Sequence, residues 1–323
     1  MNGAEHTAGR DGGALRGLGE RVAAEVGKVV VGRRDAVEIL IIALSVGGHV
    51  LIEGVPGVAK SLLAEATARA LGVEFKRVQF TPDMLPSDLT GTVTLRGGDF
   101  GFRRGPVFTN ILLADEINRT PPKTQAALLE SMQERQVSVE GEAHPLPEPF
   151  LVIATQNPIE YEGTYPLPEA QLDRFLVRLD AGYPTPEEEG AMLRLAHRGV
   201  SPATLADVRP VVEAAALEHA RAEVDTTAAT DDVQAYLLAI VRGTRELPSV
   251  ALGASSRAAV HLLAASKGAA RAAGREFVTP DDVSRMAPSV LGHRLVLSPE
   301  AELERYRAAD AVEAALAAVP VPR

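Results

Sequence analysis

Five short, almost wholly apolar runs occur in the first part of the chain, at 49–53, 75–78, 110–114, 150–154 and 175–179. Each lies near a turn or a helix signal, which is typical of strands buried on both faces of a parallel sheet. Helical patterns at 60–71 and 121–133 separate the runs, the second with Thr120 as its cap and Pro121 at its first position. Strands that alternate with helices predict a doubly wound α/β fold with a parallel five-stranded sheet.

The character of the sequence changes after residues 183–186, which read Tyr-Pro-Thr-Pro. Ala-rich amphipathic helices follow, and Thr279, Pro280 and two acidic residues form a helix start. We expect a core over 16–199 and a small all-helical domain over 200–310. The polar, glycine-rich residues 1–15 predict a disordered tail, and 311–323 are expected to be a C-terminal tail.

Composition excludes several classes of function. The 33 basic and 43 acidic residues give a net charge of −10 with no long basic run, so no nucleic-acid partner is expected. The absence of cysteine excludes disulfides, thiolate metal sites and cysteine nucleophiles. The most apolar stretch, 39–52, is too short to span a bilayer, and the N-terminus has no apolar segment of a signal peptide. We expect a cytoplasmic protein without membrane insertion.

The most specific motif is a glycine-containing loop between the first apolar run and the first helix. Such a P-loop directs backbone N–H groups and a helix N-terminus at the phosphates of a nucleotide, while Lys60 reaches the β- and γ-phosphates and Ser61 ligates Mg²⁺. Ala59 replaces the usual glycine before the lysine, which is tolerable if its conformation is helical. A glycine-rich turn that binds nothing is the alternative, disfavoured because strand, loop and helix are all present. The expected nucleotide-binding residues here are Gly54, Val55, Pro56, Gly57, Val58, Ala59, Lys60, Ser61 and Leu62.

Two acidic residues end the third apolar run and provide the expected hydrolytic groups. Parallel strands bring their carboxyl ends to one edge of the sheet, so Asp115 and Glu116 should lie beside the P-loop. Asp115 is expected to hold Mg²⁺, largely through water, and Glu116 to act as general base on the attacking water. Alone, the pair could equally be a solvated helix start.

Three further polar residues are candidates for the transferred phosphate. Asn157, after the fourth run, could bind the γ-phosphate or orient the water, although Asn157-Pro158 is also an ordinary turn signal. Phosphoryl transfer needs positive charge beyond Lys60 and Mg²⁺, and Arg174 and Arg257 are the candidates.

In this order and spacing, the motifs GVPGVAKS, GPVFTNILLADEINR, ATQNP, LPEAQLDRF and GASSRA resemble the AAA+ superfamily and, within it, the MoxR group. The resemblance runs from about Val29 to Leu295 and implies a P-loop NTPase αβα core followed by a helical lid, with ATP and Mg²⁺ as cofactors. It implies that Asn157 is sensor 1, Arg174 an arginine finger and Arg257 sensor 2. It also places Val31 and Gly32 near adenine.

The resemblance implies an ATPase that works as a homo-oligomer, most often a hexameric ring, and remodels or matures a client protein or inserts metal into it. A separate von Willebrand A domain protein is the expected partner, since no DxSxS signature occurs in this chain. Segments 90–108 and 136–149 resemble inserts that face the ring channel or client, and two plain surface hairpins are the alternative. A metal-chelatase ATPase subunit and a non-hydrolysing ATP-gated scaffold stay open as functions. The client, the oligomer number and which arginine acts in trans are not determined by the sequence.

Overall fold

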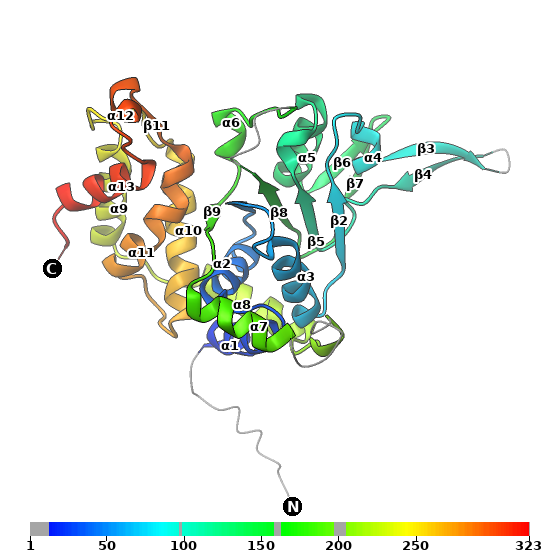
Figure 1. The fold of residues 1–323 in the computed structure, drawn as a ribbon, viewed down its shortest axis with the longest axis horizontal. Coiled ribbons are helices and arrows are strands. Elements are labelled where there is room, and N and C mark those ends of the chain that lie inside the picture. Colours follow the sequence, from blue (N-terminus) through cyan, green and yellow to red (C-terminus); the bar gives the residue numbers. More distant parts are fainter. Residues whose placement is uncertain (1–12, 97–98, 158–162, 197–204, 323) are drawn as a thin grey trace, which may run out of the picture.

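The computed structural model describes residues 13–96, 99–157, 163–196 and 205–322 (Figure 1). Its centre is a five-stranded parallel sheet in the order β2-β5-β8-β1-β9. The predicted strands are therefore confirmed, with bounds shifted by a residue or two: β1 (Val50–Gly54), β2 (Phe75–Gln79), β5 (Ile111–Asp115), β8 (Leu151–Gln156) and β9 (Val177–Ala181).

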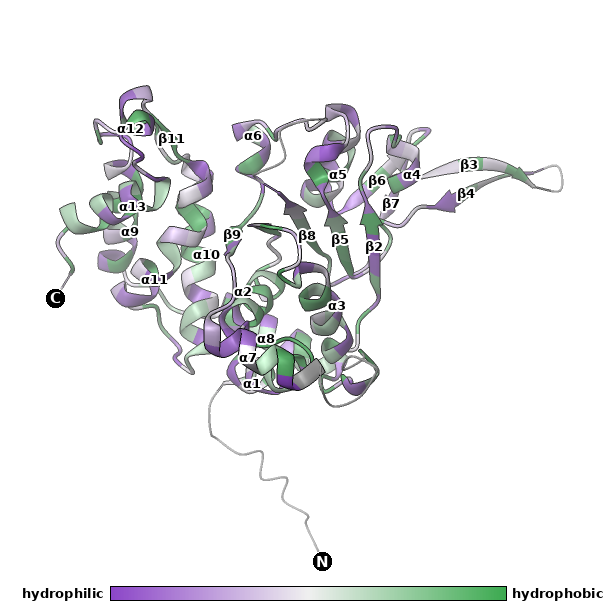
Figure 2. Cartoon of the chain, in the orientation of Figure 1, coloured by the Kyte–Doolittle hydropathy of each residue, from purple (hydrophilic) through white to green (hydrophobic). Residues whose placement is uncertain are grey.

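The sheet is hydrophobic on both faces. Strands β5 and β8 are buried almost throughout and hydrophobic up to their polar last residues, whereas the edge strand β2 carries hydrophilic residues (Figure 2). Successive side chains of a strand point to opposite faces, so Leu51 and Ile52 enter two different hydrophobic clusters, as do Leu112 and Leu113. This double burial explains why the strands appear as continuous apolar runs rather than as alternating ones.

Helices cover the two faces. One face packs on α1 (Ala14–Val26), α2 (Arg34–Ser45) and α3 (Lys60–Leu71), and the other on α5 (Pro122–Glu134). Helix α3 has the predicted bounds. Helix α5 begins one residue later than predicted: Pro121 takes the capping position expected of Thr120, and Pro122 is the first helical residue. No helix in the described part of the chain is long and apolar enough to cross a membrane.

Both expected inserts form hairpins. Strands β3 (Gly91–Arg96) and β4 (Asp99–Arg104), which follow the short helix α4 (Pro86–Thr90), project away from the body of the molecule and expose Leu95 and Phe100 (Figure 1). The second hairpin consists of β6 (Gln136–Val139) and β7 (Glu142–Pro145). It turns at Glu140 and Gly141, both of which have positive φ.

The helical lid contains α9 (Asp231–Gly243), α10 (Ser256–Ala272), α11 (Pro280–Leu291), α12 (Pro299–Leu303) and α13 (Ala308–Ala318). Helix α11 starts as predicted, with a capping box between Thr279 and Asp282. The lid also has a two-stranded sheet, β10 (Val250–Leu252) with β11 (Val296–Leu297), which the sequence did not reveal. Lid and core share one hydrophobic cluster, and a Cβ on Gly268 of α10 would lie 2.7 Å from Ile42 of α2.

Two of the expected segment boundaries need correction. The C-terminal tail expected from residue 311 is largely helix α13, because Ala311, Val312 and Ala315 are buried against the lid. Helix α8 (Ala214–Asp225), which follows α7 (Pro186–Ala196), was assigned to the lid but packs on α1 and α2 as well as on α10. The expected boundary at 199/200 and most of the expected N-terminal tail lie outside the described residues.

Candidate functional site

The P-loop joins the end of β1 to the start of α3, as the sequence predicts. A Cβ on Gly54 would lie 2.3 Å from the carbonyl oxygen of Ala181 in β9, so only glycine fits beside that strand. Gly57 has φ +85° with open space around it, a conformation that favours glycine. The Lys60 Nζ donates a hydrogen bond to the Gly54 carbonyl across the loop. The loop thus leads directly into the N-terminus of α3, where backbone N–H groups face a ligand.

Ala59 does not meet the condition of a right-handed helical conformation under which alanine is easily tolerated there. Its φ of 60° and ψ of 26° lie in the left-handed region, where a Cβ is unfavourable. The usual glycine at this position is therefore explained by the backbone, and alanine is accommodated with strain. Backbone strain of this kind is typical of functional sites.

The structure brings Ser61 and Asp115 together at the carboxyl edge of the sheet. The Ser61 Oγ donates to the Asp115 Oδ2 over 3.1 Å, and the Thr155 Oγ1 donates to the other carboxylate oxygen. Arg77 from β2 pairs with the same carboxylate at 2.7 Å. One buried carboxylate beside a hydroxyl is a donor set that suits Mg²⁺, which takes few protein ligands and keeps several waters. The described residues contain no cluster of three or more His, Asp or Glu side chains that would suit another metal.

Glu116 also has a left-handed backbone, with φ 57° and ψ 50°. Its N–H donates to the Thr155 Oγ1 over 2.9 Å, so one threonine fixes both acidic residues. Its carboxylate accepts from the Gln79 Nε2 over 2.6 Å and pairs with Arg119 at 3.0 Å. The second carboxylate therefore lies beside the partners of the first and stays partly accessible to water.

Asn157 lies immediately after β8 and is buried. Its neighbour Gln156 hydrogen-bonds to Glu53, which precedes the P-loop and pairs with Arg178 at 3.5 Å. The tip of β8 is thus tied to the end of β1. Because β8 lies between β1 and β5 in the sheet, this arrangement brings Asn157 between the P-loop strand and the acid strand.

A cavity of about 240 Å³ adjoins the P-loop. Lys60 and Val58 line it from the loop and Gly32 from the turn before α2, while Ile52, Leu179 and Ala181 add apolar surface. Val31, also expected near adenine, lines a neighbouring hollow between α1 and the start of α2 instead. Arg33, Asp35 and Asp180 add charged groups to the lining, and a pocket of such mixed character that ends at a phosphate-binding loop suits an adenine base.

Arg174 and Arg257 are not part of this assembly. Arg174 precedes β9, and Leu176 is hydrogen-bonded to the His49 carbonyl at the start of β1, whereas the P-loop begins at Gly54, about 16 Å further along that strand. The segment that carries Arg257 lies near Asp173, because the Ser255 Oγ donates to the Asp173 carboxylate over 3.0 Å. Both arginines therefore lie at the end of the sheet where the strands begin, here called the strand-start edge. This is too far away for either to contact a nucleotide in the P-loop of the same subunit.

The side chains of these two arginines have a further property in common. Arg174 is half-buried and its Nε has no hydrogen-bond partner, and Arg257 is exposed in the first turn of α10. Neither guanidinium forms an ion pair with a described residue, although most other arginines near the sheet do. The strand-start edge therefore carries two cations with no anion assigned to them within the described chain.

Comparison with known proteins agrees with this geometry. The profile of the ATPase family associated with various cellular activities (AAA) matches residues 49–177, and that of the AAA lid domain matches 242–315. The chain is 44% identical to the Chaperone MoxR1 of Mycobacterium tuberculosis over 94% of this chain and 82% of that protein. It is 33% identical to the Protein MoxR of Methylorubrum extorquens over 95% and 96% of the two chains. The chain belongs to the MoxR family of AAA+ ATPases.

A solved structure supports the fold of this MoxR-family chain. The crystal structure of a protein of Cytophaga hutchinsonii, described as a candidate ATPase, superposes with a TM-score of 0.88 at 39% identity and covers 96% of each chain. The predicted family and the predicted α/β P-loop fold with a helical lid are thereby confirmed.

Several polar residues of this MoxR-family site were missed by sequence reasoning. Arg77 and Gln79 bind the two acidic residues, and their spacing of two on β2 places them on one face of that strand. Thr155 was seen only as part of the motif after the fourth run, with no role assigned. The alternation in β2 was the available signal, but its use requires knowing that β2 is the neighbour of β5.

Proposed function

We propose that the chain binds ATP with Mg²⁺ and hydrolyses it in order to remodel a partner protein. The observation that carries this proposal is the convergence of Lys60, Ser61, Asp115 and Glu116 at one edge of the parallel sheet, beside a partly apolar cavity. A nucleotide-gated scaffold needs the cavity and the P-loop, but it has less need of a second, partly accessible carboxylate such as that of Glu116.

Each residue has a distinct role in the proposed reaction. Lys60 exchanges the Gly54 carbonyl for the β- and γ-phosphate oxygens, and Ser61 and Asp115 hold the magnesium ion. Mg²⁺, when bound, neutralises charge on the phosphates. Glu116 accepts a proton from the water whose oxygen forms the new bond to the γ-phosphorus, while the bond to the β–γ bridging oxygen breaks and ADP leaves. Asn157 orients that water or the γ-phosphate.

Assembly completes the proposed site. Because Arg174 and Arg257 lie at the strand-start edge, we infer that both act on the nucleotide of a neighbouring subunit, in a homo-oligomer that we take to be a hexameric ring. An arginine supplied in this way contributes a factor of roughly 10³ or more to phosphoryl transfer. ATP turnover should therefore require subunit contact.

The name of a 44% identical relative, Chaperone MoxR1, supports protein remodelling as the work done. We propose that this occurs in the cytoplasm, with a separate von Willebrand A domain protein as partner, and that maturation or metal loading of a client is the outcome. The β3–β4 hairpin, with exposed Leu95 and Phe100, is the proposed client contact.

The experiment that tests the proposal is the Glu116→Gln substitution, which keeps the size of the side chain and removes the base. The variant should bind ATP and assemble like the wild type, while release of phosphate falls by roughly 10²–10⁴-fold. Glu134→Gln, an exposed position at the end of α5, is the matched control and should retain wild-type turnover. Normal turnover by Glu116→Gln would remove Glu116 as the base, and an inactive wild-type chain would favour the scaffold.

A further inference from the structure

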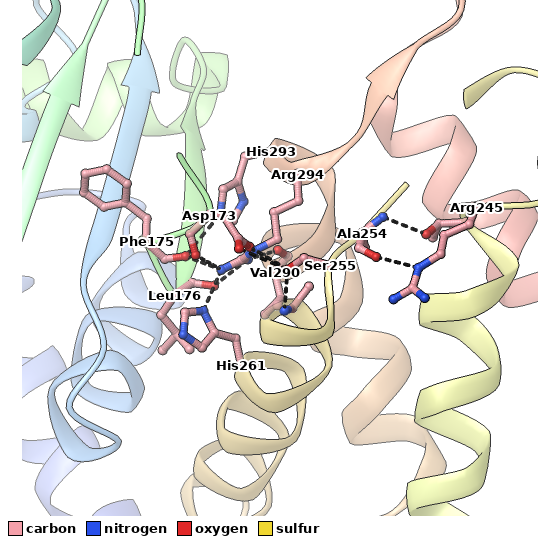
Figure 3. Close-up of polar contacts among 12 residues, drawn as sticks. Asp173, Phe175, Leu176, Arg245, Ala254, Ser255, His261, Val290, His293 and Arg294 are labelled. Atoms are coloured by element: carbon pink, nitrogen blue, oxygen red, sulfur yellow. Dashed lines mark hydrogen bonds and ion pairs between the residues drawn. The ribbon is translucent and has the colours of Figure 1, made fainter. Parts of the chain in front are cut away.

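The side chain of Arg294 links the lid to the segment that carries Arg174. Arg294 lies in the short helix η3 (Gly292–Arg294), and Figure 3 shows it between the lid and this segment. Its side chain is only 1% exposed. Its Nε donates to the Asp173 carboxylate over 2.7 Å, and its two terminal nitrogens donate to the main-chain carbonyls of Asp173, Phe175 and Leu176. All four of these acceptors belong to one short turn between α6 (Glu169–Leu172) and β9.

The remaining hydrogen bonds of Arg294 go to the lid. Its guanidinium donates to the Val290 carbonyl in α11 and to the His261 Nδ1 in α10, the latter over 2.6 Å. Burial and the charge of Arg294 lower the pKa of His261 to about 4, so that ring is neutral and can accept. His293 supports the same turn, with its Nε2 placed 3.3 Å from the Phe175 carbonyl.

The Asp173 carboxylate has a second partner in the lid. The Ser255 Oγ donates to both of its oxygens, over 3.1 and 3.0 Å, and also accepts from the Ala258 N–H as the N-cap of α10. Asp173 therefore lies one residue from Arg174 and is tied to the residue that caps the helix bearing Arg257. The Asp173 carboxylate thus accepts hydrogen bonds from both Ser255 and Arg294. Through this one carboxylate, the turn that carries Arg174 is joined to the helix that carries Arg257.

Burial of this arginine is costly unless its charge is paired and its N–H groups are bonded, and removing one partner from such a pair is strongly destabilising. The buried contacts of Arg294 hold the turn against α10. Arg174 on the turn is half-buried, Arg257 on α10 is exposed, and neither has an ion-pair partner among the described residues.

We propose that Arg294, acting through Asp173 and Ser255, is a positioning residue that holds Arg174 and Arg257 in one fixed arrangement, so that both reach the nucleotide of the neighbouring subunit together. The inference rests on the proposed function, because it assumes that the two arginines act on that nucleotide. It assigns a role in turnover to three residues that lie outside the nucleotide cavity of their own subunit.

The test uses Ser255→Ala, which removes the link between Asp173 and the N-cap of α10 and leaves the buried Arg294–Asp173 pair intact. In the full-length assembled protein, kcat should fall by roughly ten-fold or more, as expected when a transition-state contact is displaced, while the KM for ATP stays unchanged. Ser255→Thr should restore kcat, because it restores the hydroxyl. Arg285→Ala is the matched control, since it breaks a half-exposed lid–core ion pair with Glu38 at 2.9 Å and should leave kcat at the wild-type value.

Mixing two kinds of variant subunit distinguishes misplaced arginines from a general loss of structure. Ser255→Ala subunits have an intact P-loop and a displaced pair of arginines, while Lys60→Ala subunits have the reverse. A mixture of the two should hydrolyse ATP faster than either alone, because intact arginines then face intact P-loops. Unchanged kcat in Ser255→Ala, or no gain on mixing, would overturn the proposal.

Two substitutions distinguish the positioning role of Arg294 from the trans role of Arg174. If Arg174→Ala abolishes turnover but Ser255→Ala does not affect it, the positioning role is wrong and the proposed function stands. If Arg174→Ala itself has wild-type turnover, the trans role in the proposed function is wrong, and the positioning role with it.

Discussion

The strand-start edge of the central sheet and the opposite edge, where the strands end at the P-loop (the strand-end edge), differ in the partners of their charged side chains. At the strand-end edge each acidic residue has a cation from its own chain: Asp115 pairs with Arg77, and Glu116 pairs with Arg119. At the strand-start edge Arg294 is fully bonded, whereas Arg174 and Arg257 have no ion-pair partner in the described chain. Under the proposed function, the first of these edges receives the nucleotide of its own subunit, and the second presents its two arginines to a neighbouring subunit.

The largest expected effect tests the strand-start edge directly. Arg174→Ala should reduce ATP turnover by roughly 10³-fold while ATP affinity stays near the wild-type value, because the arginine does not contact the nucleotide of its own subunit. Phosphate release and nucleotide titration measure the two quantities. Weakened ATP affinity in the isolated variant subunit would contradict the contrast between the two edges, since it would place Arg174 within reach of its own P-loop.

A second effect concerns the pH dependence of stability at the same edge. The pKa of His261 is lowered to about 4, by burial first and then by the nearby positive charges of Arg294 and Arg257, with Asp173 opposing them. The unfolded state therefore takes up the proton first, so the free energy of unfolding should fall as the pH drops from about 6.5 to about 4, by at most about 3 kcal/mol from this group.

His261→Asn supplies the comparison for that measurement, because the amide oxygen can still accept from Arg294 but does not titrate. Urea unfolding at a series of pH values should show a shallower loss of stability for the variant than for the wild type. Parallel curves would mean that His261 is not held neutral by this arrangement.

A smaller effect is expected at the strand-end edge. Thr155→Val removes the hydroxyl that donates to Asp115 and accepts from the Glu116 N–H, and so leaves two buried polar groups without that partner. The free energy of unfolding should fall by about 2 kcal/mol, and Thr155→Ser should recover most of it. A Thr155→Val variant more stable than the Thr155→Ser variant would show that the methyl packing, and not the hydroxyl, matters here.

The smallest effect concerns the backbone of the P-loop. Ala59→Gly should raise the free energy of unfolding by up to about 1 kcal/mol, because it relieves the left-handed alanine, whereas Gly57→Ala should lower it by a similar amount. Thermal or urea unfolding of both variants checks the opposite signs. A destabilised Ala59→Gly variant would contradict the interpretation of Ala59 as strained.

The two edges also differ in how far the sequence predicts them. The P-loop and the acidic pair were predictable because each lies within a few residues of a strand end, and local order fixes their place on a parallel sheet. The role of Arg77 depends on β2 lying next to β5, which no local pattern determines. The contact between Arg294 and Asp173 joins residues far apart in the sequence, and the left-handed Ala59 depends on the folded loop.

The close contact between Gly268 and Ile42 has a consequence for how such a protein moves. Helices α10 and α2 meet with no room for a methyl group, inside a hydrophobic cluster that continues from the core into the lid. Bending the subunit at this junction would expose an apolar interior to water, which costs about 25 cal/mol per Å². We therefore expect core and lid to move together as one rigid body, and any motion within an assembly to occur at the interfaces between subunits.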